Sequence, residues 1–232
     1  MPLTLAFLQA RMGSTRLPGK VLLQIQGKSI LERALERLGA ARSLDGAVVL
    51  TTLRDEDDRL AEEARRLGVE CFRGPDRDVL ARFRQAADRY QPEVIVRATA
   101  DNPLIDIGSV DRIIARLRAE DLDYCMEREL PVGAATEAIT SGALARVDRL
   151  GLLPHHREHV TIFIKEHRGE FRAAFPQPPP ALRRPEVRLT VDTPEDFTAV
   201  ADLIRTLPED GPPIPLLTYL ERAPALISRL RA

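Results

Sequence analysis

The 232-residue sequence contains no tryptophan, and aromatic residues make up only 4% of it. Surfaces for single-stranded nucleic acids stack bases on aromatic side chains, so this scarcity disfavours such a surface. The formal net charge of −1 also disfavours general binding to nucleic acids or membranes. We find no secretory signal and no apolar run of roughly 18 residues that could cross a bilayer. An anionic ligand would therefore have to be bound by a few well-placed cations.

Cysteine is scarce as well, and the two cysteines, Cys71 and Cys125, lie far apart in strand-like segments. They form no C-x-x-C motif, which is typical of reduced residues in a core. Together with the missing secretory signal, this predicts a cytoplasmic protein.

Lysine is nearly absent too, since Lys20, Lys28 and Lys165 are the only three among 34 basic residues and the rest are arginines. An ammonium is a compact point charge, whereas a guanidinium is planar and larger. In a composition that so strongly favours arginine, the lysine at position 20 indicates a site that needs the smaller cation.

Apolar runs alternate with helical patterns through the first half of the chain. Strands are predicted at residues 3–8, 47–50, 69–72 and 94–96, and helices at 30–41, 55–67, 78–90 and 110–118. Ser29 and Glu32 form a capping-box pattern at the first helix. Near-continuous apolar strands that alternate with helices predict an α/β fold with a mostly parallel central sheet and helices on both faces.

The second half is less regular, and a single domain over residues 1–232 is the simplest prediction. Here we predict a strand at 121–126, a loop or arm at 129–140, helices at 141–150 and 155–167, a strand at 186–192, a helix at 193–207 and a helical tail within 213–232. The D-x-D pairs at 55/57 and 121/123 are attributed to solvated faces.

The segment QARMGSTRLPGK, residues 9–20, leaves the carboxyl end of the first strand, where open α/β sheets bind ligands. It is not a Walker A loop, because five residues separate Gly13 from Gly19 and valine follows Lys20. Gly13 nevertheless allows close backbone approach, and Arg11, Arg16 and Lys20 could neutralise phosphate charge. The alternative is a solvated basic loop.

Two aspartates follow predicted strands and could meet at one sheet edge. Asp101 lies in VRATADNPLID, and Asp192 lies in RLTVDTPEDF. Carboxylates at such an edge suit Mg²⁺, which prefers oxygen ligands. The alternative for Asp101 is a cap for the next helix or turn. Thr193 and Pro194 make a good helix start, which leaves Asp192 without a structural task.

The HHREH segment, residues 155–159, places His155 and His159 one helical turn apart. The H-E-x-x-H order is absent and no cysteine is near, so zinc is disfavoured. Contacts with a substrate from Arg157, Glu158 and His159 are the alternative to a structural role.

Five segments, in this order, carry a resemblance that covers residues 3–204: QARMGSTRLPGKVL, RGPDRDVLARF, VRATADNPLID, REHVT and RLTVDTPEDF. Together they resemble the spore coat polysaccharide biosynthesis protein F family, within the acylneuraminate and keto-deoxy-octulosonate (KDO) cytidylyltransferases. The resemblance implies a Rossmann-like nucleotidyltransferase fold. It also implies Mg²⁺-dependent transfer of CMP from CTP to a sugar, with release of pyrophosphate.

The resemblance further implies site residues. It places around the nucleotide Gln9, Ala10, Arg11, Gly13, Ser14, Arg16, Lys20, Thr51, Thr52, Asp78, Arg82 and Ala100. It implies catalytic roles for Arg11, Lys20, Asp101 and Asp192, of which Asp101 and Asp192 would bind magnesium. It places at the sugar Asn102, Glu137, Arg157, Glu158 and His159. Relatives commonly dimerise through the region that corresponds to residues 121–140, so a homodimer is expected.

Departures from the better-known branches leave the sugar and the base open. Thr99-Ala100-Asp101 stands where KDO enzymes tend to have Gln-Gly-Asp, and Gln9-Ala10-Arg11 stands where those branches often have Pro-Ala-Arg. An acidic or surface-polysaccharide sugar is expected. A glycosyltransferase is the first alternative, disfavoured because ADNP is not a D-x-D motif. A non-catalytic nucleotide-binding homologue is the second, disfavoured because Lys20, Asp101 and Asp192 are all present.

Overall fold

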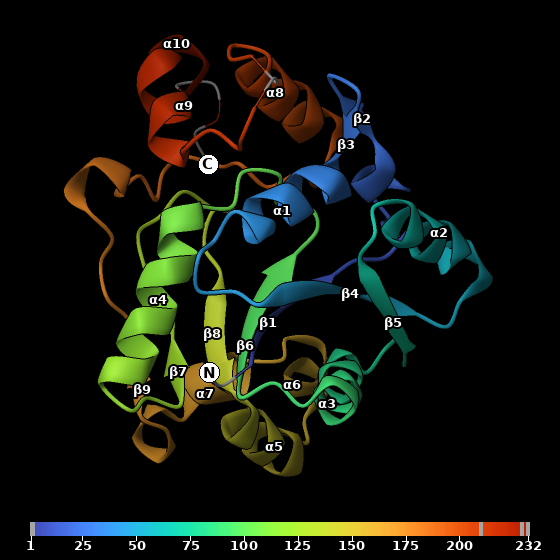
Figure 1. The fold of residues 1–232 in the computed structure, drawn as a ribbon, viewed down its shortest axis with the longest axis vertical. Helices are drawn as coiled ribbons and strands as arrows, with labels where there is room; N and C mark the ends of the chain where they lie inside the picture. The colour runs from blue at the N-terminus through green and yellow to red at the C-terminus, as the bar shows by residue number, and fades with distance from the viewer. Residues whose placement is uncertain (1–2, 209–210, 228–229, 231–232) are drawn as a thin grey trace.

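A seven-stranded sheet with helices on both faces forms the body of the protein (Figure 1). The computed structural model describes residues 3–208, 211–227 and 230. The strand order is β5-β4-β1-β6-β8-β7-β9. The strands are β1 (Thr4–Gln9), β4 (Gly46–Thr52), β5 (Glu70–Gly74), β6 (Val94–Thr99), β7 (Tyr124–Cys125), β8 (Glu137–Thr140) and β9 (Ala173–Ala174). The predicted α/β class is therefore confirmed.

The central strand β1 is buried on both faces, which explains its continuous apolar sequence. Successive side chains point to opposite faces of a strand. Ala6 and Leu8 accordingly join one core cluster, and Leu5 and Phe7 join another. Strands β4 and β6 both run parallel to β1, so the three carboxyl ends meet at one edge of the sheet.

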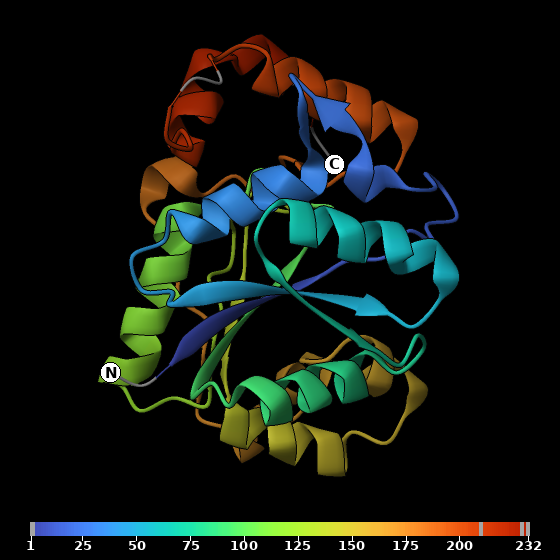
Figure 2. The same ribbon diagram turned by 45° about the vertical axis from the view of Figure 1, so that its right-hand side comes forward.

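The two faces of the sheet are covered by different helices (Figure 2). The first core cluster contains residues of α1 (Ile30–Gly39), α2 (Asp58–Arg66) and α4 (Ile107–Ala119). The cluster on the opposite face contains residues of α3 (Val79–Tyr90), α5 (Ser141–Leu150) and α7 (Ile162–Glu166). A third cluster lies beyond the sheet edge, under α8 (Pro194–Ile204), α9 (Leu216–Arg222) and α10 (Pro224–Ile227). A short hairpin of β2 (Gln24–Ile25) and β3 (Lys28–Ser29) leads into α1.

Two predicted helix starts are confirmed by their hydrogen bonds. The Glu32 backbone N–H donates to Oγ of Ser29 at 3.1 Å, which caps α1. At α8 the Asp196 N–H donates to Oγ1 of Thr193 at 3.2 Å, and the Thr193 N–H donates to the Asp196 carboxylate at 3.0 Å. This is a reciprocal capping box, and it fixes the chain directly after Asp192.

The prediction of a continuous loop at 129–140 is wrong for its last four residues. They form β8, which pairs antiparallel with β6 and buries Ala138 and Ile139. Leu130 and Ala134 are also buried, in the third core cluster. The segment therefore contributes to the sheet and to a core.

Two further predictions are corrected. The helix expected at 155–167 is divided into α6 (Pro154–Glu158) and α7, because Val160 takes a φ of 21° where its side chain becomes buried. Residues 186–192, expected to form a strand, are an extended segment instead. Within the described residues, this segment makes an isolated parallel β-bridge between Arg188 and Val132. Its alternating apolar residues pack into the third cluster, so their period of two reflects burial on one side.

The helical tail is confirmed by α9 and α10, whereas residues 228–229 and 231–232 of that prediction lie outside the described residues. Within the described part of the chain, no helix is both long enough and apolar enough to cross a membrane.

Candidate active site

A cavity of about 280 Å³ opens at the carboxyl edge of β1 and β6. The loop after β1 lines one side of it, the turn after β6 a second and the extended segment before α8 a third. Ten of the residues predicted around the nucleotide and metal line this cavity: Gln9, Ala10, Arg11, Ser14, Arg16, Lys20, Arg82, Ala100, Asp101 and Asp192. The fold thus brings these three segments and Arg82 of α3, four distant parts of the sequence, to one place.

Lys20 lies at the centre of these three segments, and its side chain is only 10% exposed. Its Nζ donates to Oδ2 of Asp101 at 2.9 Å, to Oδ1 of Asp192 at 2.8 Å and to the carbonyl oxygen of Val191 at 2.8 Å. An ammonium has three N–H donors. Each of the three thus has an oxygen partner.

Asp192 is surrounded by cations. Arg16 lies 3.2 Å from its Oδ1, and Arg188 lies 2.5 Å from its Oδ2. Partial burial acts to raise the pKa of Asp192, but the hydrogen bond and charge of Lys20, followed by Arg16 and Arg188, lower that pKa below its ordinary value. The Val191 N–H also donates to the carbonyl of Asp101 at 2.9 Å. This bond joins the two aspartate-bearing segments.

Arg82 of α3 brings a buried guanidinium to the cavity. The residue is 1% exposed, and its Nη2 donates weakly to the carbonyl of Asp76 at 3.5 Å. Its Nε and Nη1 have no hydrogen-bond partner among the described residues. Burial lowers the pKa of Arg82, although nearby carboxylates act against it. Buried cations without acceptors are costly, so the arrangement favours an acceptor supplied by a ligand.

Asp57 fastens the loop after β1 and was missed by the sequence analysis, which attributed it to a solvated face. It is fully buried. Its Oδ1 accepts from the Met12 N–H at 2.7 Å, and its Oδ2 accepts from the backbone and hydroxyl of Thr52 at the end of β4. Neither Thr51 nor Thr52 lines the cavity, and both are fully buried.

A second cavity of about 330 Å³ adjoins the first, and both are lined by Thr99. Asn102 and Glu137, two predicted sugar contacts, line this second cavity. Gly133 lines it as well, with φ at 93°. A Cβ on Gly133 would lie 2.6 Å from the Thr190 nitrogen and 2.8 Å from Oδ1 of Asn102, so only glycine fits there.

Glu137 is buried and carries a charge that its neighbours stabilise. Arg97 Nη1 donates to its Oε2 at 3.0 Å, the Thr161 hydroxyl donates to the same oxygen at 2.8 Å, and Lys165 pairs with Oε1. Burial acts to raise the pKa of Glu137. The charges of Arg97 and Lys165 and the hydrogen bonds of Lys165 and Thr161 outweigh burial, and they lower that pKa to about 2.

Other predicted residues lie outside both cavities. Asp78 caps α3 by accepting from the Ala81 N–H at 2.8 Å, and it pairs with Arg157 at 2.8 Å. Arg157 therefore attaches α6 to the start of α3. Glu158 and His159 are exposed on α6 and directly after it. Gly13 lies beside Glu56, whose carboxylate would be 2.9 Å from a Cβ at that position.

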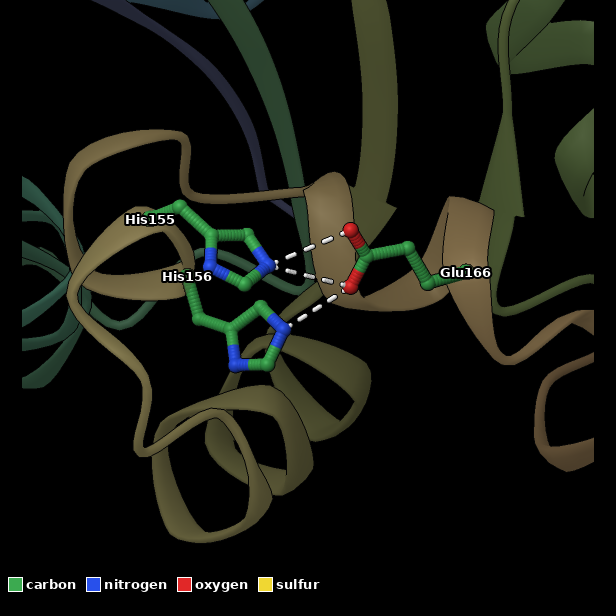
Figure 3. Close-up of side chains that lie close together, drawn as sticks. All are labelled: His155, His156 and Glu166. Carbon is green, nitrogen blue, oxygen red and sulfur yellow. Dashed lines mark hydrogen bonds and ion pairs between the residues drawn. The ribbon is translucent and has the colours of Figure 1, made fainter.

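His155, His156 and Glu166 form a cluster of possible metal ligands (Figure 3). Nε2 of His155 and Nε2 of His156 lie 3.2 and 2.8 Å from the Glu166 carboxylate. The Leu153 N–H donates to Nδ1 of His156 at 3.3 Å, so the proton of a neutral ring sits on Nε2 and points at Glu166. A metal-bound ring would carry its proton on Nδ1 instead. The cluster is therefore a set of hydrogen bonds that links α6 to α7.

The remaining site residues that the sequence analysis missed are arginines in apolar surroundings. Arg97 interrupts the buried strand sequence VIVRAT, and Arg188 interrupts the alternating segment EVRLTVD. A charged residue inside an apolar run is the signal that could have identified both, because such a residue needs a partner. Arg97 pairs with Glu137 on another strand, and Arg188 pairs with Asp192 four residues further along the same extended segment.

Comparisons with known proteins agree with this geometry. A sequence profile for the family described as cytidylyltransferase matches residues 5–226. The chain is 39% identical to an uncharacterised protein of Methanocaldococcus jannaschii over 199 residues, which are 86% of this chain and 82% of that protein. It is 34% identical to spore coat polysaccharide biosynthesis protein SpsF of Bacillus subtilis over 227 residues, 95% of each chain. A solved cytidylyltransferase structure from Leptospira borgpetersenii serovar Hardjo-bovis superposes with a TM-score of 0.91 at 31% identity, over 98% of this chain and 97% of that one.

Proposed function

Because the chain belongs to the cytidylyltransferase family, we propose that it transfers CMP from CTP to a sugar and releases pyrophosphate. The observation that carries this proposal is the first cavity, where Lys20, two aspartates and a buried, partly unpaired arginine converge. Such a set of charges suits a triphosphate and the cation that accompanies it.

The cations of the loop are suited to the triphosphate. Arg11, Arg16 and Lys20 all line the cavity, and each can donate hydrogen bonds to phosphate oxygens. Pyrophosphate gains negative charge as it leaves, and fixed cations stabilise that charge. Phosphoryl transfer depends mainly on positioning and charge neutralisation, so the site needs no covalent nucleophile from the protein.

Asp101 and Asp192 fit a divalent cation, and we assign Mg²⁺ to them. Their carboxylates are hard oxygen ligands, which magnesium prefers. The Lys20 ammonium stands in for such a cation here, since its Nζ lies within 2.9 Å of both carboxylates. The two aspartates can therefore approach one positive centre. When bound, magnesium would neutralise charge on phosphoryl oxygens.

The second cavity suits the sugar, because it adjoins the first at Thr99. In this reaction a sugar hydroxyl attacks the α-phosphorus of CTP, and the bond to pyrophosphate breaks. Asn102 can orient a hydroxyl there, since its buried Oδ1 has no partner among the described residues. The name of the Bacillus subtilis relative favours a sugar destined for a surface polysaccharide.

We further propose a cytoplasmic location, since Cys71 and Cys125 are both free thiols and free thiols persist in reducing compartments. A homodimer remains a prediction for the intact protein.

Pyrophosphate release tests the proposed reaction. Purified protein is mixed with Mg²⁺, each of the four nucleoside triphosphates in turn, and a panel of acidic and neutral sugars. Release with CTP and one sugar, together with the CMP-sugar in the mass spectrum, is the expected result. If calorimetry shows that no triphosphate binds, the assignment of the first cavity is wrong.

A further inference from the structure

The Lys20 ammonium occupies a cage of three oxygens that leaves it no free donor. The three oxygens belong to Asp101, Asp192 and the Val191 carbonyl, all within 2.9 Å of Nζ. A guanidinium could not occupy this cage in the same way, because its five donors lie in one plane on three nitrogens. This geometry explains why a sequence with so few lysines has one at this position.

Two of these oxygens, those of Asp101 and Asp192, are the ligands that the proposed function assigns to a divalent cation. Two cations cannot share them at this distance, because like charges in a partly buried site repel each other strongly. The other oxygen of Asp192 does not offer an alternative, since Arg188 holds it at 2.5 Å. A divalent cation that reaches this pair must therefore displace the ammonium.

The backbone of Lys20 is held in place, whereas its side chain has the rotatable bonds that a change of partners requires. The residue begins a 3-10 helix, Lys20–Leu22, and its N–H donates to the carbonyl of Leu17 at 3.2 Å. Four rotatable bonds separate Nζ from this backbone. The first cavity, which Arg11 and Arg16 also line, lies directly beside the side chain.

We propose that Lys20 is a built-in counterion that keeps divalent cations off the Asp101–Asp192 pair until a nucleoside triphosphate enters. The triphosphate offers the ammonium new oxygen partners, and the aspartates then become available to the cation. Metal and nucleotide consequently bind together, and the metal alone binds weakly. The inference rests on the proposed function, because it assumes that this pair holds the cation.

Binding of Mn²⁺ without nucleotide tests the inference directly. Mn²⁺ shares the oxygen preference of Mg²⁺. Its binding is measured by electron paramagnetic resonance, because the signal of free Mn²⁺ decreases as the ion binds to the protein. We expect Lys20→Met and Lys20→Gln to bind Mn²⁺ at least tenfold more tightly than the wild type. Lys20→Arg cannot fill the cage in the same way but keeps a positive charge beside the two carboxylates, so its Mn²⁺ binding should remain weak. Lys28→Met is the matched control, since Lys28 pairs with Glu36 and does not line the cavity. It should match the wild type.

The same variants give a second readout through thermal unfolding. Removal of the ammonium leaves two carboxylates side by side without their shared cation, so Lys20→Met should melt at a lower temperature in EDTA. Mn²⁺ should restore the melting temperature of Lys20→Met and change that of the wild type little. Lys20→Gln can still donate two hydrogen bonds to the carboxylates. It should therefore fold in EDTA even if Lys20→Met does not.

Two results would separate failure of the inference from failure of the proposed function. If wild type and both neutral variants bind Mn²⁺ equally, and Asp101→Asn weakens binding in each, the pair is a metal site but Lys20 does not guard it. CTP binds some Mn²⁺ by itself. If protein and CTP together bind no more Mn²⁺ than CTP alone, for the wild type and every variant, the metal assignment itself is wrong.

Discussion

Two cationic residues of the first cavity, Arg82 and Lys20, differ in how completely their hydrogen-bond donors are satisfied. Arg82 is the less satisfied of the two, since it is buried and two of its nitrogens have no partner among the described residues. Lys20 is the opposite case, since every donor has a partner. Both arrangements suit a triphosphate. Its oxygens would supply the acceptors that Arg82 lacks, and they would replace the aspartates as acceptors for Lys20.

Arg82→Met should make the free protein more stable and the nucleotide complex weaker. The substitution removes a buried charge whose pKa is already lowered by burial, and a buried charge without acceptors is costly to the folded state. It also removes donors that face the cavity. We expect a higher melting temperature and a Kd for CTP at least tenfold higher by calorimetry. A variant that is destabilised and binds CTP normally would show that Arg82 is a structural residue.

Asp101→Asn should lower turnover severely and leave the fold intact. The amide keeps the size of the side chain but loses the negative charge that the proposed cation requires. We expect kcat to fall by on the order of a thousandfold in saturating Mg²⁺, with an unchanged circular dichroism spectrum. Asp202→Asn is the matched control, because Asp202 on α8 pairs with Arg205 directly after that helix and does not line the cavity. A near-normal rate for Asp101→Asn would remove Asp101 from the site.

The sequence predicted those site residues whose role is visible in their own segment. Gln9 to Lys20 form one loop, and Asp101 and Asp192 each end an apolar run, so strand-end reasoning identified them. Asp57 and Arg97 could not be found in this way, because their partners Met12 and Glu137 are brought near only by folding. Arg188 pairs with Asp192 only four residues away, but it lies inside the apolar run and not at its end. A D-x-D pair at a helix start looks the same in sequence whether it is solvated or, as at Asp57, buried.

At the scale of elements, hydrophobic periodicity predicted the first half of the chain, where strands and helices alternate. Apart from the short β2–β3 hairpin, which was not predicted, the strands and helices up to α4 follow a regular β-α order, and the predicted ranges agree with the structure to within a few residues. The failures lie where that order ends. Strand β8 pairs antiparallel with β6, and the alternating segment 186–192 packs against helices instead of a strand. Alternation reports burial on one side, and it does not identify what covers that side.

Asp57→Asn should loosen the connection between the loop after β1 and the end of β4. An amide NH₂ in place of Oδ2 would face the N–H and hydroxyl of Thr52, which are both donors. Buried donors without acceptors cost about 1–3 kcal/mol each, so we expect a destabilisation of about 2 kcal/mol in urea unfolding. The KM for CTP should rise more than kcat falls, because the phosphate-facing loop is less well ordered.

Asp55→Asn is the control for that experiment. Asp55 begins the same short 3-10 helix but is exposed, and exposed substitutions usually change stability by less than about 0.5 kcal/mol. If Asp55→Asn and Asp57→Asn have equal effects on KM, the hydrogen bonds of Asp57 do not position the loop.

At the scale of the whole molecule, Glu137 joins separate parts of the fold. It lies on β8, and its carboxylate contacts Arg97 on β6, Thr161 before α7 and Lys165 on α7. The antiparallel part of the sheet is thus attached to the parallel part and to the helices below it through one charge. The stability of this assembly should depend on whether that charge is present.

Acid unfolding of wild type and Glu137→Gln measures this dependence. The folded-state pKa of Glu137 is lowered from 4.5 to about 2. Its stabilising contribution is therefore complete above the unfolded-state pKa and is lost as pH falls from 4.5 towards 2. A shift of this size corresponds to on the order of 3 kcal/mol. The difference in unfolding free energy between wild type and Glu137→Gln should be largest near pH 6 and shrink by about that amount at pH 2. Glu120→Gln, which alters an exposed pair with Arg116, should show a small and nearly constant difference. A constant difference for Glu137→Gln as well would mean that the charge does not hold these parts of the fold together.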